Sequence, residues 1–306
     1  MHAGLVGRML IESLAGIPVT VDLASEYRYA PPVTVGHTLA VPVSQSGETS
    51  DTLQALRLAR KNGLSSLGVI NVVGSAIARE SDAVMYTGAG PEIAVATTKG
   101  YASQVTVLAM LAVKLGYLRG RIGAERASEL CHSLADVLPA NIAEIISRRP
   151  EIAELAKKIY SHDDLFYIGR GPDCAAAPEC SLKLKEISYI HSEAYAAGEL
   201  KHGTLSLVTE GTPVIALATD PKYYDKMTGN IREVKSRGGY VILVAAPDFP
   251  SPDEYADDVF VLPAVDPTLS PLESAVFSQL LAYEAALLRG CDVDHPRNLA
   301  KSVSVE

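Results

Sequence analysis

Three absences narrow the class of protein that this sequence encodes. The chain of 306 residues carries a net charge of −9 and has no cluster of Lys and Arg, so we expect no nucleic-acid-binding surface. The longest apolar helical run, Val105–Leu115, is interrupted by Lys114 and is expected to be too short to cross a membrane. The start of the chain, Met1–Gly4, leads straight into an amphipathic helix rather than into a signal peptide.

Cysteine is also scarce and has no spacing typical of metal ligands. The four cysteines are scattered along the chain: Cys131, Cys174, Cys180 and Cys291. This pattern predicts reduced, mostly buried thiols in a cytoplasmic protein without a metal site.

Apolar runs typical of strands alternate with helical patterns, which predicts an α/β fold with parallel sheets covered by helices. With 48% hydrophobic residues the chain can bury a large core, and we expect two domains. The strands expected in the second half are Leu165–Ile168, Val214–Ala218, Tyr240–Ala245 and Val259–Leu262. The helices expected there run from Gly169–Gly171 to about Tyr189, from Thr219–Pro221 to about Arg237, and over Leu272–Arg289, with a polar segment before Val214.

The first half repeats this order of elements. Its expected strands are Leu39–Val43, Leu67–Asn71 and Ala83–Tyr86. Its expected helices run from Ser44–Thr49 to about Asn62 and over Thr98–Leu115. The repeat predicts two tandem doubly wound parallel-sheet domains, residues 1–150 and 151–290, with helical residues 118–160 between their sheets and a tail over residues 291–306.

The first domain is expected to lack its opening strand. The helix Gly4–Leu14 corresponds to the helix that follows Leu165–Gly171, but no strand and Gly-rich turn precede it. We therefore interpret the chain as a fragment of a longer parent, or as a reading frame begun at an internal Met.

A hydroxyl-rich segment, Ser44–Thr49, follows an apolar strand and opens a helix whose apolar face includes Leu53, Leu56 and Ala59. Backbone N–H groups at such a helix start, together with three hydroxyls, favour a phosphate-binding loop. The alternative is ordinary N-capping by Ser or Thr. The hydroxyls are too many for one cap, so we predict phosphate binding.

A charged cluster lies in the span Glu179–Gly203. Glu179, Lys183 and Glu186 are spaced to share one helix face. Spacing alone favours a surface ladder of ion pairs. The helix follows a Gly-rich turn, however, and open α/β sheets bind ligands at the carboxyl ends of their strands, which favours an active site.

Two further segments supply candidates. His202 lies between Gly198 and Gly203 and could be a mobile acid–base group, although a solvated loop histidine fits equally well. The tail carries Arg297 and Lys301, which could close over an anionic substrate.

Five segments resemble one known family: Ser44–Thr52, Asn71–Val84, Ala89–Tyr101, Leu182–Gly203 and Cys291–Glu306. They read SQSGETSDT, NVVGSAIARESDAV, AGPEIAVATTKGY, LKLKEISYIHSEAYAAGELKHG and CDVDHPRNLAKSVSVE. Together the chain resembles the isomerase half of the glutamine–fructose-6-phosphate aminotransferases, which is built from two flavodoxin-like sugar-isomerase (SIS) domains.

The resemblance implies a substrate-binding set. Ser44, Gln45, Ser46 and Thr49 would hold the sugar phosphate, and the sugar would be lined by Val95 (through its backbone), Thr97 and Ala300. Thr97 stands where the family usually has Ser, which keeps the hydroxyl.

The resemblance also implies catalytic roles. Glu186 would move a proton between C1 and C2, and Lys183 would stabilise the charge of the enediol-like intermediate. His202 would open the ketose ring from the neighbouring subunit of a homodimer. Lys301 would form the Schiff base at C2, with Arg297 beside it in the tail that closes the active site.

By this resemblance the chain would convert fructose 6-phosphate to glucosamine 6-phosphate without a metal or cofactor. A glutaminase domain or subunit would supply ammonia, and neither that domain nor the family's Cys-Gly-Thr-Ser turn is in the sequence. We therefore expect no glutamine-dependent synthesis by this chain alone. Two alternatives are a stand-alone SIS deaminase or deglycase and a non-catalytic SIS module that senses a sugar phosphate.

Overall fold

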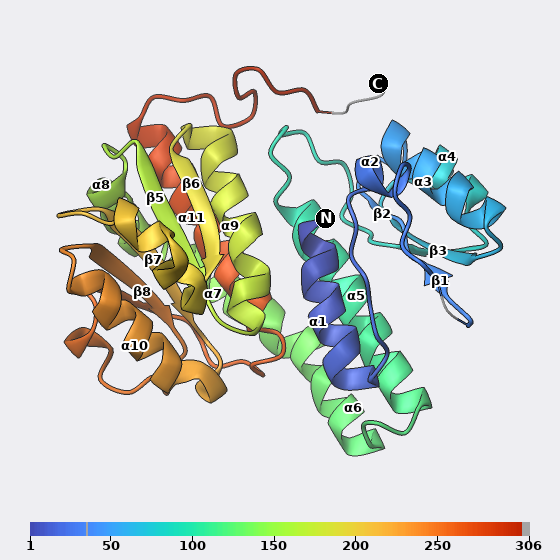
Figure 1. The fold of residues 1–306 in the computed structure, drawn as a ribbon, viewed down its shortest axis with the longest axis horizontal. Helices are drawn as coiled ribbons and strands as arrows, with labels where there is room; N and C mark the ends of the chain where they lie inside the picture. Colours follow the sequence, from blue (N-terminus) through green and yellow to red (C-terminus); the bar gives the residue numbers. More distant parts are fainter. Residues whose placement is uncertain (35, 302–306) are drawn as a thin grey trace. The chain divides into compact units, whose positions relative to one another are not determined.

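A computed structural model describes residues 1–34 and 36–301 of the chain (Figure 1). Its contacts define two compact units. The first unit comprises Met1, Ala3–Gly123 and the tail from Asn298, and the second comprises His2 and Ala124–Arg297.

The first unit contains a small parallel sheet with helices on both faces. Its strands are β1 (Leu39–Ala40), β2 (Val43–Ser44), β3 (Ser65–Ile70) and β4 (Ala83–Tyr86). Its helices are α1 (His2–Ala15), α2 (Ala24–Tyr27), α3 (Ser50–Lys61), α4 (Ala76–Glu80) and α5 (Lys99–Leu118).

The strand predicted over Leu39–Val43 forms as two short pieces, β1 and β2. Both pair with β3 in one constant register, Leu39 with Ser65 and Val43 with Val69. Pro42 lies between the pieces and has no N–H to donate to the ladder. The other edge of β3 pairs with β4, and no strand precedes β1 in the described part of this unit.

The second unit contains a larger sheet in which every pairing is parallel. Its strands, in the spatial order β6-β5-β7-β8-β9, are β6 (His191–Ala196), β5 (Asp164–Gly169), β7 (Pro213–Ala218), β8 (Tyr240–Ala245) and β9 (Asp258–Val261). This is the doubly wound flavodoxin-like order, and the predicted fold class is confirmed. The order β1/β2, β3, β4 of the first unit repeats β7, β8, β9.

Helices cover both faces of the second sheet (Figure 1). The α-helices of the second unit are α6 (Ala124–His132), α7 (Leu138–Ser147), α8 (Arg149–Ile159), α9 (Pro172–Ser188), α10 (Tyr224–Lys235) and α11 (Ser270–Leu288), of which α9 and α10 contact the strands. The shorter turns are the π-helix η1 (Ser133–Val137) and the 3₁₀ helices η2 (Ala197–His202), η3 (Thr204–Leu207), η4 (Pro221–Tyr223) and η5 (Pro252–Glu254).

Alternating strand residues divide the core between these helices. Val214, Ala216 and Ala218 of β7 belong to the cluster that includes Met227 and Ile231 of α10. The other face of the sheet is covered by α9, which packs along α11. Successive side chains of a strand point to opposite faces, so both faces are buried.

The structure corrects three expectations. The polar segment after α9 contains an edge strand, β6, which pairs only with β5 among the described strands. Its half-exposed sequence HSEAYA hides the apolar signal of a buried strand. All four thiols are free as expected, but only Cys180 is buried. The apolar run around Val105–Leu115, which was expected to be too short to cross a membrane, is part of the longer helix α5 (Lys99–Leu118).

That helix, α5, runs for 20 residues and is long and apolar enough to cross a membrane by length and composition. The core helix of a globular domain passes the same test. Here α5 packs closely on α1, because Gly7 leaves room for Leu108 and Gly116 for the backbone of Leu14. A Cβ at Gly7 would lie 2.8 Å from Leu108 Cδ1.

Candidate active site

The hydroxyl-rich loop Ser44–Thr49 connects β2 to α3 and is held by its own side chains. Ser44 is buried, and its Oγ accepts the N–H of Gly47 at 3.0 Å and lies 3.4 Å from Thr49 Oγ1. Ser46 Oγ accepts the N–H two residues further on at 3.2 Å. Thr49 is the N-cap residue of α3 but its side chain makes no cap hydrogen bond. Ordinary N-capping therefore does not account for this loop.

Backbone N–H groups at the start of α4 support the loop, and the Ser75 hydroxyl lies close to it. Gly47 O accepts the N–H of Ile77 at 3.0 Å, and Glu48 Oε1 accepts the N–H of Ala76 at 2.8 Å. Gly47 has φ +68°, and a Cβ there would collide with Ser75 Oγ. Ser75 Oγ is buried without a hydrogen-bond partner among the described residues. Ser75 was not predicted as a site residue, although a Gly-Ser pair between a strand and a helix was a usable signal.

Gln45 and Thr97 come together over Gly100. A Cβ on Gly100 would lie 2.7 Å from Gln45 Oε1 and 2.6 Å from Thr97 Cγ2. Gln45 Oε1 is buried and has no hydrogen-bond partner among the described residues. The N–H of Gly100 donates to Glu92 Oε2 at 2.9 Å, which fixes the loop that carries Val95 against the start of α5.

The tail brings Lys301 to the same loop. Its Nζ donates to the backbone oxygen of Ala94, the residue before Val95. Ala300 and Lys301 are exposed, and the tail from Asn298 groups with the first unit. The remaining tail residues, 302–306, lie outside the described residues.

A buried ion-pair triad lies on α9 of the second unit. Lys183 Nζ is 2.6 Å from Glu186 Oε2 and 3.3 Å from Glu179 Oε1. The Lys183 and Glu179 side chains are 5% and 6% exposed, against 21% for Glu186. The alternative of a surface ladder is therefore wrong. Glu186 is thus the more exposed of the two carboxylates.

The triad does not lie at the carboxyl ends of the strands, where the sequence predicted the active site. A helix between two parallel strands returns from the carboxyl edge of the sheet to its amino edge. Glu186 lies near the end of α9, roughly 20 Å along the helix from Pro172 at 1.5 Å per residue. The triad therefore does not lie at the carboxyl ends of the strands, where the start of α9 lies, and the prediction that placed it there was wrong.

Arg297 lies at the same end of α9 as Glu186. Its guanidinium carbon is 4.2 Å from the centre of the Tyr189 ring. The backbone N–H of Arg297 donates to Tyr189 Oη at 2.7 Å. Tyr189 ends α9 in a left-handed conformation with φ +60°. Tyr189, for which no role was predicted, thus anchors the first part of the tail.

His202 lies at the other edge of the second sheet. It ends η2, directly after β6, and is exposed. Because β6 starts shortly after α9 ends, the length of β6 separates His202 from the end of α9. The second unit of one chain therefore does not bring His202 to Glu186.

Comparisons with known proteins identify the family. The model of the SIS domain matches residues 1–114 and 158–289. The chain belongs to the SIS-domain family. The glutamine–fructose-6-phosphate aminotransferases (isomerizing) of Symbiobacterium thermophilum and Caldanaerobacter subterraneus are 55% and 50% identical to it over 305 residues.

Within the SIS proteins, the chain belongs to the isomerase half of these aminotransferases. The C-terminal domain of glucosamine-fructose-6-phosphate aminotransferase from Francisella tularensis has a TM-score of 0.91 and 35% identity, and the match covers 96% of this chain and 84% of that one. This chain spans about half the length of the curated relatives it matches, 50% of each of the two named above. The resemblance seen in the sequence is thus confirmed.

A more distant SIS structure bears on the deaminase alternative. Glucosamine-6-phosphate deaminase from Thermotoga maritima matches with a TM-score of 0.79 but only 24% identity. At that identity the likeness shows the SIS fold alone, so it does not favour deaminase chemistry in this chain.

Proposed function

We propose that this chain carries the isomerase part of glucosamine 6-phosphate synthesis from fructose 6-phosphate. The observation that carries the proposal is the buried Lys183, held between Glu179 and the more exposed Glu186. An ammonium group 2.6 Å from Glu186 can stabilise negative charge on an enediol-like intermediate, while the carboxylate moves a proton from C1 to C2 of a fructose imine.

The first unit would supply substrate binding. Phosphate would lie on the loop Ser44–Thr49, where the N-terminus of α3 and its N–H groups favour an anion. Gln45 Oε1 and Ser75 Oγ are buried polar atoms without partners among the described residues, and a bound ligand would satisfy them. Val95, Thr97 and Ala300 would line the sugar.

Lys301 would form the Schiff base. Its amine would add to the C2 carbonyl with loss of water, and exchange with ammonia would release the lysine and leave the ketose imine. Arg297, stacked on Tyr189, would bring a fixed cation to the end of α9. The ammonia would come from a glutaminase domain or subunit, in keeping with relatives about twice as long as this chain.

A homodimer would bring His202 of one chain to the site of the other. The opposite positions of His202 and Glu186 along the second sheet support this sharing. His202 would then protonate or deprotonate the ring oxygen as the ketose opens. We also propose a cytoplasmic location, because four free thiols fit a reducing compartment.

The test replaces Glu186 with Gln. Glu186→Gln should lower hexose-phosphate isomerisation, and ammonia-dependent glucosamine 6-phosphate formation, by about 10²–10⁴-fold, because the proton carrier is lost. The dissociation constant for fructose 6-phosphate, measured by calorimetry, should hardly change.

Glu179→Gln is the matched control, since it removes the other carboxylate that Lys183 contacts. A smaller loss of rate is expected from it. Equal losses from both variants, or a parallel loss of binding in Glu186→Gln, would show that the triad is only structural.

Mixed dimers test the sharing of His202. Glu186→Gln and His202→Ala chains, each inactive alone, should regain about a quarter of wild-type activity when mixed in equal amounts, since half of the dimers then hold one intact site. Mixed dimers without any recovered activity would assign both residues to one chain.

A further inference from the structure

The second unit has a pocket of about 260 Å³ at the carboxyl ends of β7, β8 and β9. This edge of an open parallel sheet is where such folds bind ligands. It lies away from the end of α9 that carries Lys183 and Glu186, so the proposed reaction does not use it. Its volume suits one small molecule.

Most of the pocket wall is apolar. Eight of its twelve lining residues are Ala, Pro, Leu or Val, and its polar lining residues are Thr219, Asp248, Ser270 and Glu273. No Lys or Arg is among the lining residues in the described part of the chain. A phosphate or carboxylate would therefore find no cation here, and the acidic side chains would repel it.

The hydroxyls of the pocket are already engaged. Thr219 Oγ1 lies 2.7 Å from Asp173 Oδ1 and 2.6 Å from Ser270 Oγ, and Ser270 Oγ is 2.9 Å from the backbone oxygen of Pro267. Asp248 Oδ1 accepts the hydroxyl of Tyr224 at 2.6 Å.

Unlike these groups, the Glu273 carboxylate has one oxygen without a hydrogen-bond partner in the described structure. Its residue is fully buried, and Oε1 accepts the amide of Asn141 at 2.8 Å, but Oε2 has no hydrogen-bond partner among the described residues. A buried carboxylate oxygen without a donor is costly, so it marks the place of a missing donor. Burial raises the pKa of Glu273 to about 7, in keeping with this lack of compensation.

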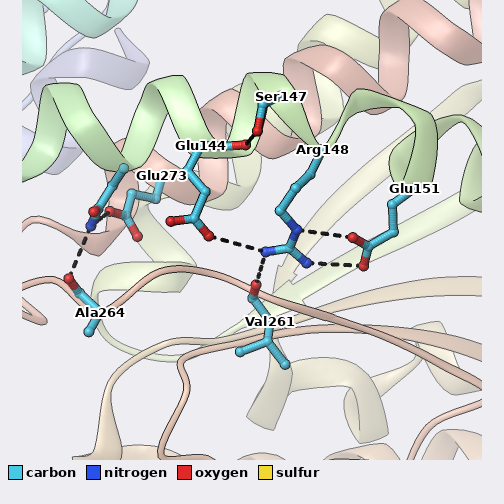
Figure 2. A network of polar contacts seen from close by, with 8 residues as sticks. Glu144, Ser147, Arg148, Glu151, Val261, Ala264 and Glu273 are labelled. Carbon is cyan, nitrogen blue, oxygen red and sulfur yellow. Dashed lines mark hydrogen bonds and ion pairs between the residues drawn. The ribbon is translucent and has the colours of Figure 1, made fainter.

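The pocket wall is firmly held. Figure 2 shows Glu273 beside Ala264, whose backbone oxygen accepts the amide of Asn141 at 3.0 Å. In the same view Arg148 donates to Val261 O, at the end of β9, at 2.6 Å and to both carboxylate oxygens of Glu151 at 3.0 Å. These contacts fix the segment after β9, so the pocket exists before any ligand arrives.

We propose that this pocket binds a small organic ammonium ion, with its apolar body against the Ala and Pro wall and its N–H groups on Glu273 Oε2. The ammonium supplies both the donor and the positive charge that the pocket lacks. The site would act independently of the isomerase chemistry.

Three probes with one ring and different charges test this assignment: cyclohexylamine, cyclohexanol and cyclohexanecarboxylate. Each is titrated into the full chain by calorimetry, and amide chemical shifts locate the binding. The amine should bind at least about tenfold tighter than the carboxylate, with shifts at Ala246 and Ala264. Stronger binding of the alcohol or carboxylate, or no saturable binding of the amine, would overturn the proposal.

Glu273→Gln should lower the affinity for cyclohexylamine about tenfold, because the charge-assisted hydrogen bond is lost. Glu284→Gln removes another carboxyl of α11, which contacts Arg149 and does not line the pocket, and should bind the amine as the wild type does. Should Glu273→Gln fold poorly, Ala264→Leu fills the exposed rim and should block the amine. Wild-type affinity in both pocket variants would refute the assignment.

Discussion

The loop after β2 in the first unit and the loop after β7 in the second occupy equivalent places in two copies of one fold, yet their chemistry is opposite. The first loop, Ser44–Thr49, presents hydroxyls, a left-handed Gly47 and the start of α3. The second, Thr219–Pro221, carries Asp220, whose side chain accepts the N–H of Lys222 at 3.0 Å.

Two buried carboxyl groups near the second loop add to the difference between the two loops. Behind the second loop the carboxyl of Asp173 accepts the N–H and the hydroxyl of Thr219, and burial raises its pKa to about 6. Glu273 lies in the same region. The same edge of a parallel sheet thus occurs twice, while short loop segments decide whether hydroxyl or carboxyl groups gather there.

The largest expected effect concerns Glu273, a buried carboxyl in the acidic region of the second unit, and the pH dependence of stability. Glu273 has its pKa raised from 4.5 to about 7 by burial, so between these values the folded state binds a proton that the unfolded state does not. The free energy of unfolding should therefore fall as pH rises from 4.5 through 7. Glu273→Gln should remove up to about 3 kcal/mol of this fall and be the more stable protein at pH 8.

Urea unfolding at several pH values measures the difference. Asp173, whose raised pKa acts in the same direction, stays present in both proteins, so the wild-type-minus-variant curve isolates Glu273. Parallel pH profiles of the two proteins would contradict the prediction.

The next largest effect is expected in the loop Ser44–Thr49, for which we propose phosphate binding. Gly47→Ala forces a left-handed conformation on a residue with a Cβ and drives that Cβ into Ser75 Oγ, so the loop must shift. We expect a cost of about 2 kcal/mol in binding, roughly a 30-fold weaker dissociation constant for fructose 6-phosphate.

Gly63→Ala is its matched control. Gly63 also has a positive φ, +83°, but a Cβ there meets nothing within 4 Å. It should lose stability without losing affinity. Equal affinity losses in both glycine variants would mean that the loop around Gly47 does not hold the ligand.

The smallest effect tests the hydroxyls themselves. Thr49→Val keeps the shape of the side chain but removes Oγ1, which makes no cap hydrogen bond to α3. The affinity for fructose 6-phosphate should fall about fivefold, near 1 kcal/mol, while the melting temperature stays the same. A lower melting temperature with unchanged affinity would return Thr49 to the role of a structural cap.

Most strands were predictable because the sheets are parallel and buried on both faces. Tyr240–Ala245 and Ala83–Tyr86 form as predicted, to the residue, since their apolar runs end at clear turn signals. The edge strand His191–Ala196 was missed, because its half-exposed side chains carry no continuous apolar signal.

The residues of the candidate site also fall into those that the sequence indicated and those that it did not. The hydroxyl loop, the spacing of Lys183 with Glu186 and the family resemblance were all present in the sequence. Ser75 and Tyr189 were not found, since their importance comes from contacts with Gly47 and Arg297, each well separated from them along the chain.

The sequence by itself determined the repeat, most of the strands and the residue types that chemistry needs, because these depend on periodicity and local spacing. Tertiary structure decided how those residues are used. Burial made Lys183 a paired interior cation and left Glu273 Oε2 without a donor among the described residues, and the return path of α9 put Glu186 far from His202. Desolvation and the direction of a crossover helix depend on the whole fold, and no short stretch of sequence contains them.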